Sequence, residues 1–247
     1  MPSEAIPENL KCLHTQEEQL REKALALVKS DDRLSIHLFV VESAMDLADV
    51  LRQFETDEED MKVVQILGMR MFNAFGASLK LALSGYVQNS TLIMRDVLET
   101  VFLLDLFKTD RNAIKRWRFA DKRERMKEFA PVKVRDALDK RDGFKSGRRT
   151  ELYAQFSELA GHPSMKSVHM MCPEKGSDAV IGPFMEATAL EAVLSEMGRL
   201  AIQAGEHLAA FFPPEWGHGK CSRDAFTRVK LEWIGRFYPQ ATSLGER

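Results

Sequence analysis

Apolar residues recur every three or four positions along most of the chain, and this spacing predicts an all-α protein. The face formed by Leu34, Leu38, Val41 and Met45 is an example. A period of 3.6 residues is typical of amphipathic helices, and no pair of alternating runs joined by a hairpin turn indicates strands. The predicted helices include residues 8–29, 33–55, 57–84, 111–129, 151–160, 184–212 and 223–238.

These helices are expected to form one bundle-like domain. Residues 85–90 are either a tight turn or a weak point within one long helix, so we predict seven or eight helices. The domain is expected to span residues 9–240, between a disordered N-terminus (1–8) and a mobile C-terminal tail (241–247) that has little apolar periodicity.

Polar residues at the predicted helix ends suggest how those ends are capped. Asp31 is a natural N-cap for the second helix, and Ser222 for the last one. The sequence from Thr56 to Glu59 fits a capping box for the third helix. Gly161 is well placed to cap the C-terminus of the helix 151–160, because Pro163 prevents its continuation.

Two segments have no apolar periodicity and are expected to be irregular. Residues 141–150 carry two glycines and several charges, so we predict a loop. Residues 161–183 are rich in glycine and proline and form the longest irregular stretch. A loop of that length is often a lid or a binding loop when it is ordered.

Arg95 and Glu99 are the first candidates for function, because they are charged residues in the most apolar part of the chain (69–108). Their separation of four places both on one helix face. Arginine and glutamate are almost never fully buried unless they are paired. One interpretation, the more common, is a structural ion pair. The other is an arginine that holds an anionic ligand, with Glu99 orienting it.

A second candidate group lies in the segment from Tyr153 to Pro163. Tyr153 and Ser157 share a helix face, and His162 follows the helix end. A Ser–His pair can form a nucleophile, so Ser157 and His162 are candidate catalytic residues. No glycine elbow surrounds the serine, and a more common role for such a histidine is to bind backbone near the helix end.

Charge is distributed unevenly. Residues 108–149 hold 16 Lys/Arg and 7 Asp/Glu, a net charge of +9, whereas residues 1–62 hold 7 Lys/Arg and 15 Asp/Glu, a net charge of −8. Such asymmetry indicates a nucleic-acid surface, a self-complementary contact in a homo-oligomer, or simply a solvated helix whose aromatic residues face the core. The candidate nucleic-acid-binding residues are Lys115, Arg116, Arg118, Lys122 and Arg123.

Composition excludes several classes of protein. The hydrophobic fraction of 45% is ordinary for a globular protein, and the net charge of −2 argues against a chain that coats nucleic acid along its length. Cys12, Cys172 and Cys221 form no Cys-x-x-Cys pair, and His162-x6-His169-x2-Cys172 is not a usual metal spacing. We therefore predict no metal and no cofactor.

The N-terminus is polar and acidic and does not resemble a signal peptide. The longest apolar run, VFLLDLF, is far shorter than the roughly 20 residues of a membrane span. These features favour a cytoplasmic protein with no membrane contact.

The order of these motifs resembles that of a group of uncharacterised bacterial all-helical proteins of unknown function. In that pattern a helix rich in small residues precedes Arg-x-x-x-Glu and then Tyr-x-x-x-Ser-x-x-x-x-His-Pro, within residues 65–212. The matching residues here are Gly85, Arg95, Glu99, Tyr153, Ser157, His162 and Pro163. The resemblance implies a helical fold and a shared polar site, and it supplies no activity.

The chain is also similar in its predicted fold to the HEPN superfamily, which includes toxin and defence ribonucleases. That family's signature is an arginine, a polar residue and a histidine after four to six positions. Here Arg33 precedes His37 with only three residues between, and Arg199 precedes His207 with seven. Neither pair fits, so the resemblance implies a similar fold without the catalytic pair.

We therefore expect a bacterial interaction or ligand-binding module with a semi-buried polar site at Arg95, Glu99, Tyr153, Ser157 and His162. Its expected partner is another protein or a small anionic ligand. The alternative is a HEPN-related ribonuclease or a phage-defence or toxin-type effector. In that case the basic segment would hold RNA and His162 would act as acid or base.

Overall fold

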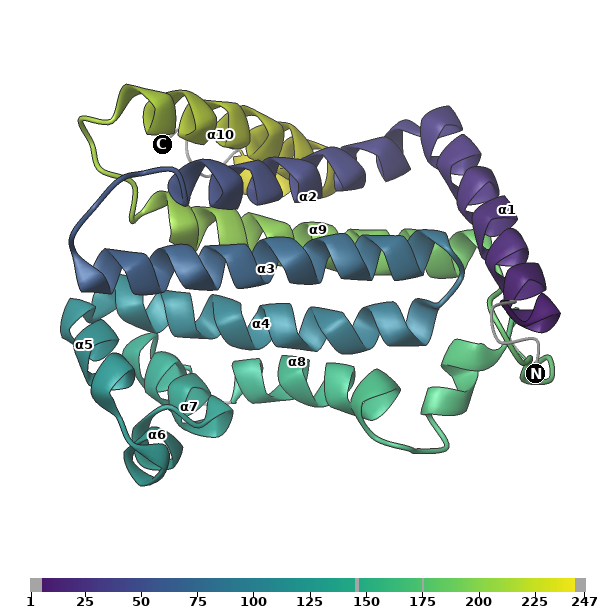
Figure 1. Cartoon of the computed structure of the whole chain (residues 1–247), viewed down its shortest axis with the longest axis horizontal. Helices are drawn as coiled ribbons and strands as arrows, with labels where there is room; N and C mark the ends of the chain where they lie inside the picture. Colours follow the sequence, from purple (N-terminus) through teal and green to yellow (C-terminus); the bar gives the residue numbers. More distant parts are fainter. Residues whose placement is uncertain (1–5, 145–146, 175, 243–247) are drawn as a thin grey trace.

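Four long helices lie side by side at the centre of the computed structural model, which describes residues 6–144, 147–174 and 176–242 (Figure 1). They are α2 (Asp32–Leu51), α3 (Glu59–Leu83), α4 (Val87–Thr109) and α9 (Ala187–Ala209). Each turns an apolar face inward, and α2 packs on α9 while α3 packs on α4. The largest fully buried side chains include Leu47, Phe75, Leu98 and Leu194. The hydrophobic core therefore lies between these four helices.

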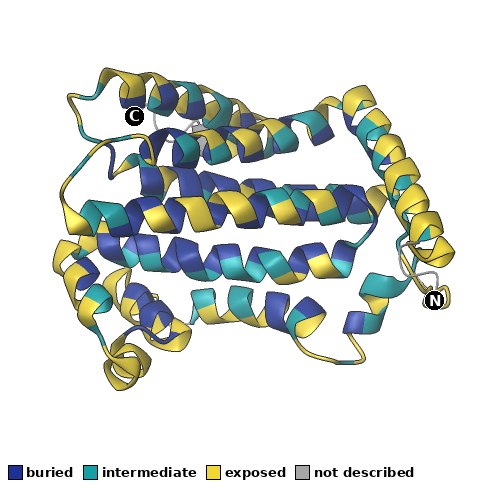
Figure 2. Cartoon of the chain, in the orientation of Figure 1, coloured by how far each residue is buried: buried dark blue, intermediate teal, exposed yellow. Residues whose placement is uncertain are grey.

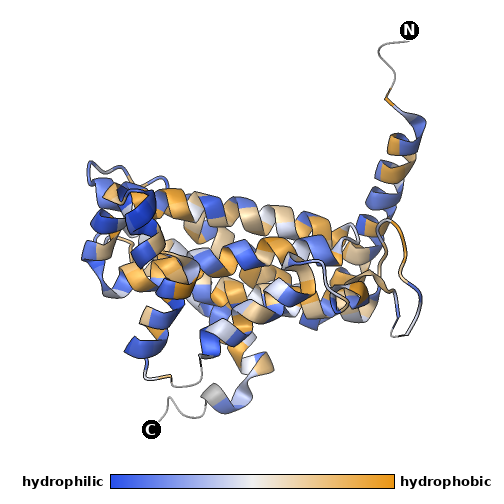
Figure 3. Ribbon diagram, turned by 90° about the horizontal axis from the view of Figure 1, so that it is seen from below, coloured by the Kyte–Doolittle hydropathy of each residue, from blue (hydrophilic) through white to orange (hydrophobic). Residues whose placement is uncertain are grey.

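The other helices cover the edges of this bundle. α10 (Gly217–Phe237) lies along α2, and α1 (Glu8–Ser30) crosses one end and buries only Ala24 and Val28 (Figures 1 and 3). Below α4 in Figure 1 lie α5 (Arg111–Phe119), α6 (Lys122–Glu128), α7 (Pro131–Arg141) and α8 (Arg148–Phe156). A π-helical turn η1 (Ser157–Gly161), a 3₁₀ turn η2 (Ser167–Met171) and the short α11 (Pro239–Thr242) complete the fold.

The described residues confirm an all-helical single domain without strands, but the predicted number of helices is wrong. Nine helices have nine or more residues, rather than seven or eight in all, and α6 and α11 are shorter. The stretch 111–129, predicted as one helix, is two. At Asp121 the carboxylate accepts the Glu124 N–H at 2.8 Å, and the Glu124 carboxylate accepts the Asp121 N–H at 3.0 Å. This capping box forms the N-terminus of a separate helix, α6.

Some predicted helix ends are confirmed and others are wrong. Asp31 does cap α2, since its carboxylate accepts the Arg33 N–H at 2.8 Å. α3 begins two residues later than predicted, and Thr56 instead accepts the Glu58 N–H at 3.1 Å within the preceding turn. Ser222 does not begin a helix. α10 already starts at Gly217, and the buried Ser222 hydroxyl donates to Asp46 at 2.9 Å.

The boundary between α3 and α4 is a tight turn rather than a weak point in a longer helix. Gly85 has a φ of +89°, and a Cβ there would lie 2.5 Å from the Phe184 carbonyl oxygen. The Phe184 N–H donates to the Gly85 carbonyl at 3.3 Å. Only glycine fits both the left-handed backbone and this close approach. Because Phe184 is tied to the turn, α9 begins at Ala187 and not at Phe184 as predicted.

The ends of the chain differ slightly from the predicted domain limits. Glu8 already belongs to α1, and residues 241 and 242 belong to α11. The rest of the predicted disordered N-terminus and mobile tail falls largely on residues 1–5 and 243–247, outside the described residues. No helix in the described part of the chain has both the length and the apolar character needed to cross a membrane.

Burial divides the helices into two groups (Figure 2). The central helices are dark blue on their inner faces, whereas α1 and α6 are mostly exposed. The core also contains His37, which is 1% exposed, accepts the Trp233 indole N–H at 2.8 Å and stacks on the Phe237 ring at 4.4 Å. Burial lowers the pKa of His37 to about 4. This histidine is therefore neutral inside the folded protein.

We predict that His37 makes folding sensitive to acid. Its pKa is lower in the folded chain than in the unfolded one, so protons taken up as the pH falls bind the unfolded chain preferentially. Between pH 7 and 4.5 this removes about 2–3 kcal/mol from the free energy of unfolding. Urea denaturation against pH measures the loss.

The variant His37→Asn keeps an acceptor for the Trp233 indole and should lack this part of the pH dependence. The matched control His169→Asn alters an exposed histidine and should behave as the wild type. Identical pH slopes for wild type and His37→Asn would contradict the assignment.

Candidate functional site

A line of polar side chains runs between α4, α7 and α8, and we call it the polar seam. Its members are Arg95, Glu99 and Asp105 of α4, Arg135 and Asp139 of α7, Arg149 and Tyr153 of α8, and Ser157 of η1. Most of them are spaced four apart on their helix, which places them on one face. α8 buries only Phe156, so polar contacts largely hold it against α4 and α7.

The first part of the seam brings Arg95, Glu99 and Tyr153 together, as the sequence predicted. The Arg95 Nε–H donates to the Tyr153 hydroxyl at 2.9 Å, and Nη2 of the same guanidinium donates to it as well. The hydroxyl donates to Glu99 Oε1 at 2.8 Å, while Arg95 Nε lies 3.5 Å from that oxygen. The side chains of Arg95 and Glu99 are 25% and 31% exposed. The pair is semi-buried, and Tyr153 connects its two members.

Gly161 makes room for Arg95. A Cβ at Gly161 would lie 2.7 Å from Arg95 Nη1, so a larger residue would displace the guanidinium. The prediction that Gly161 caps the helix is wrong, because Gly161 is still the last residue of η1 and His162 occupies the cap position. The helix ends instead in the wider turn η1, where the His162 N–H donates to the Ser157 carbonyl at 3.0 Å. Such π turns occur often at functional sites.

Ser157 and His162 do not form a catalytic pair in this structure. The Ser157 hydroxyl is buried and has no hydrogen-bond partner, while His162 is exposed and touches Ser157 only through its backbone N–H. A general base must be within hydrogen-bond reach of the proton that it removes. The geometry therefore gives Ser157 no activating base.

Arg135 joins the candidate site, although it was not among the residues predicted for it and is one of 16 basic residues in its segment. It is 5% exposed, and its Cζ lies 4.0 Å from the centre of the Tyr153 ring. Its Nε and Nη1 atoms are buried and have no hydrogen-bond partner. Its position beside Val134, on the apolar side of α7, was the one available signal. Tyr153 thus lies between two arginines.

A hollow of about 320 Å³ lies beside Glu99, between α3, α4, α5 and α7. Its walls are largely apolar, and the Arg70–Asp96 ion pair lies among its lining residues. The apolar lining residues are Ile66, Leu67, Phe102, Leu103, Trp117, Phe129, Pro131 and Val134. Small-molecule sites have this character, with apolar walls and a few polar groups, at volumes from roughly 300 Å³.

The other end of the seam is a network of ion pairs. Arg141 binds Asp105 through two hydrogen bonds of 2.9 and 3.0 Å, and Arg149 donates to Asp139 at 2.8 Å. Both arginines also bind Asp142. Asp105 and Asp139 are buried. The predicted loop 141–150 is too long, because Arg141 still belongs to α7 and α8 begins at Arg148; residues 145 and 146 lie outside the described residues. Through Arg141, Asp142 and Arg149 this region joins α7 and α8 to α4.

His207 of α9 also faces this network. Its Nδ1 is buried without a hydrogen bond, 4.0 Å from Asp105 Oδ1. Burial lowers the pKa of His207, although the nearby Asp105 acts in the opposite direction. The imidazole is consequently held neutral, and the arginines compensate the Asp105 charge.

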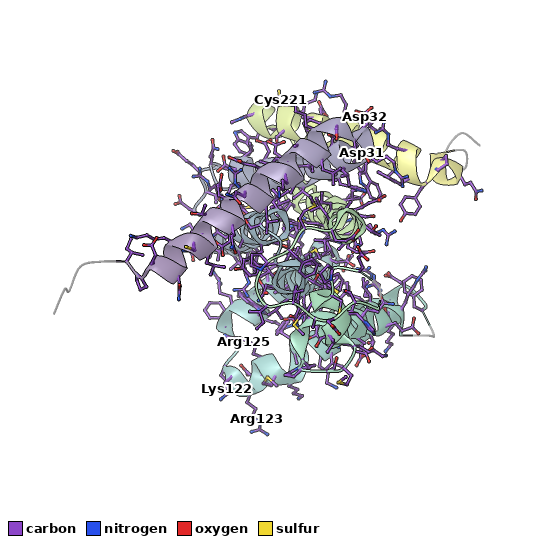
Figure 4. All side chains as sticks on the ribbon, turned by 90° about the vertical axis from the view of Figure 1, so that its right-hand side faces the viewer. Asp31, Asp32, Lys122, Arg123, Arg125 and Cys221 are labelled. Atoms are coloured by element: carbon purple, nitrogen blue, oxygen red, sulfur yellow. The ribbon has the colours of Figure 1, made fainter. Side chains whose placement is uncertain are left out.

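The basic residues that were candidates for nucleic-acid binding fall into two groups. Arg116 is paired with Asp110 and Glu128, and Arg118 with Glu59 and Asp60, so both support the fold. The others are exposed and have no ion pair; they are Lys115, Lys122 and Arg123. Figure 4 shows Lys122 and Arg123 on α6 at one edge of the molecule, opposite Asp31, Asp32 and Cys221.

Within the described residues, no group of three or more histidine, cysteine or acidic side chains could hold a metal ion, and the three cysteines are free. A scan against protein-family models finds no match for the chain, and searches of curated proteins and of solved structures find no significant match. Function is therefore argued from the chemistry of the site.

We predict that Arg149→Met destabilises the protein strongly. The substitution removes the partner of the buried Asp139 and weakens the compensation of Asp105. Removal of one member of a buried ion pair costs about 3–5 kcal/mol. Urea denaturation should show this loss, whereas Arg148→Met, at an exposed neighbour without an ion pair, should change stability by less than about 0.5 kcal/mol. Equal effects of the two variants would contradict a structural role for the network.

Proposed function

We propose that the chain is a ligand-binding module whose polar seam holds a small anionic ligand at Arg135, next to Tyr153 and Arg95. The observation that carries this proposal is the state of Arg135. Its guanidinium is almost completely buried and has no carboxylate partner, whereas Arg149 in the same seam and Arg141 beside it are paired. The buried carboxylates Asp105 and Asp139 have arginine partners, whereas the Arg135 guanidinium lies over the Tyr153 ring.

The chemistry of the site favours an anion. A buried polar group without a partner costs about 1–3 kcal/mol, and more when it is charged. A carboxylate or a phosphate would accept the free N–H groups of Arg135 in charge-assisted hydrogen bonds. Arg95, Arg135 and Glu99 carry a net charge of +1, which suits a ligand with about one negative charge. Tyr153 would fix the separation of the two guanidinium groups.

The hollow beside Glu99 offers space for the rest of the ligand. Its aromatic and aliphatic walls suit an apolar or planar body. Glu99 belongs both to the hollow and to the Arg95–Tyr153 group, so a body in the hollow would lie next to the anion site. The proposed ligand is therefore a small amphiphilic molecule with a carboxylate or phosphate group.

The alternative function, a HEPN-related ribonuclease or defence effector, receives less support. His162 would have to act as acid or base, but its imidazole is exposed and is not hydrogen-bonded to Ser157, Tyr153 or Glu99. We therefore retain ligand binding as the better proposal and assign no catalytic residue.

We predict opposite consequences of Arg135→Met for stability and for binding. Methionine of similar length replaces an uncompensated buried charge, so the free energy of unfolding should stay within about 1 kcal/mol of the wild type or rise. Binding of inorganic phosphate or acetate, followed by isothermal titration calorimetry, should weaken at least about tenfold, or about 1.4 kcal/mol.

Arg149→Met serves as the comparison, because it removes a paired arginine from the same seam. Two results would contradict the proposal. One is a loss of stability in Arg135→Met as large as that in Arg149→Met, which would make Arg135 a structural residue. The other is a wild-type protein that binds neither phosphate nor acetate.

A further inference from the structure

α6 is a helix that buries none of its residues. All eight residues from 121 to 128 are exposed, and the helix stands out at the lower corner of Figure 1. Short isolated helices are marginal in water. Here the capping box at Asp121 and the ion pair between Arg116 and Glu128 at 2.8 Å hold α6 beside α5. The fold thus maintains a helix that contributes nothing to the hydrophobic core.

The acidic and basic side chains of this region differ in how they are used. Asp121 and Glu124 are engaged in the capping box, and Glu128 is engaged by Arg116. By contrast, four exposed cations have neither an ion pair nor a side-chain hydrogen bond in the described structure: Lys115, Lys122, Arg123 and Lys127. The acidic side chains of this region are thus already hydrogen-bonded or ion-paired, and the four cations remain without an acidic partner.

The same segment carries an exposed aromatic ring. Trp117 and Phe129 of the same segment pack against the core, but Phe119 is 69% exposed. The Arg118 guanidinium lies 4.7 Å from the centre of its ring. Phe119 and Lys127 also line a shared hollow of about 650 Å³ between α5 and α6, whose other charged lining residues are Arg116, Glu124 and Glu128. We call Phe119 and the four free cations the α5–α6 surface.

We propose that the α5–α6 surface binds single-stranded nucleic acid, with phosphates on the cations and a base stacked on Phe119. Lysine and arginine bind phosphates with release of counterions, and stacking on one aromatic ring is worth about 1–3 kcal/mol per base. An acidic protein partner fits less well. The exposed large apolar residues of α5 and α6 are Phe119 and Met126. Two such side chains provide too little apolar area for the core of a protein–protein interface. The surface uses none of the residues of the polar seam.

The test uses fluorescein-labelled single-stranded oligonucleotides of about 12 nucleotides, RNA and DNA, with the full chain and fluorescence anisotropy as the readout. Binding is expected at about 50 mM salt and should weaken steeply towards about 200 mM, because counterion release governs it. The double variant Lys122→Glu/Arg123→Glu should bind at least about tenfold more weakly. Phe119→Ala should cost about fivefold or more, as the loss of one stacked base implies.

A matched control changes two exposed lysines of α1 that have no ion pair, in Lys23→Glu/Lys29→Glu. This control changes the net charge by the same amount and should bind like the wild type. Arg135→Met should also bind normally, which separates this proposal from that of the anion site. Circular dichroism checks that every variant is folded.

Three results would overturn the proposal. The first is no binding of either oligonucleotide at low salt. The second is an equal loss of affinity in the α1 control, which would show that the effect depends only on the net charge of the protein. The third is full binding by Phe119→Ala together with equally effective competition by poly-glutamate of the same charge, which would show attraction to any polyanion rather than recognition of a nucleic acid.

Discussion

The need to compensate the buried charge of Asp105 constrains how α7 and α8 pack on α4. Asp105 is a buried carboxylate near the C-terminal end of α4, one of the central helices, and a buried charge is tolerated only when it is compensated. Arg141 from the end of α7 and Arg149 from the start of α8 supply that compensation. These ion pairs join both helices to α4. α7 also buries Val134 and Leu138 in the core, whereas α8 buries Phe156 alone.

The candidate site follows from the position of α8. Arg149 fixes one turn of this helix, and Tyr153 on the next turn reaches Arg95 and Glu99. The same arrangement places Arg135 against the Tyr153 ring and leaves its N–H groups without a partner. One seam thus contains charges that are paired within the fold and one, Arg135, that has no carboxylate partner. In this account Arg149 has a structural role, and Arg135 has the proposed role in ligand binding.

The sequence predicted the helical class, most of the helices and the group of Arg95, Glu99 and Tyr153, because periodicity and spacing of four are local properties. It did not identify Arg135 or the partners of Asp105, since those contacts join different helices and not neighbouring turns of one helix; Arg141 and Asp105, for example, are 36 residues apart. Nor could spacing tell that the His162 side chain would stay exposed. The spacing indicates only that the His162 backbone follows a helix end, whereas the exposure of its side chain depends on the turn η1.

The central claim is that Arg135 is a buried, unpaired cation that accepts an anion. The most direct measurement is the ¹⁵N–¹H NMR signal of its Nε–H group in the wild-type protein during a titration with inorganic phosphate. The proposal predicts a saturable change in the shift of this signal and slower exchange with water, while the Arg149 signal stays constant. A signal of Arg135 that is indifferent to phosphate and to acetate, with binding detected at other residues, would contradict it.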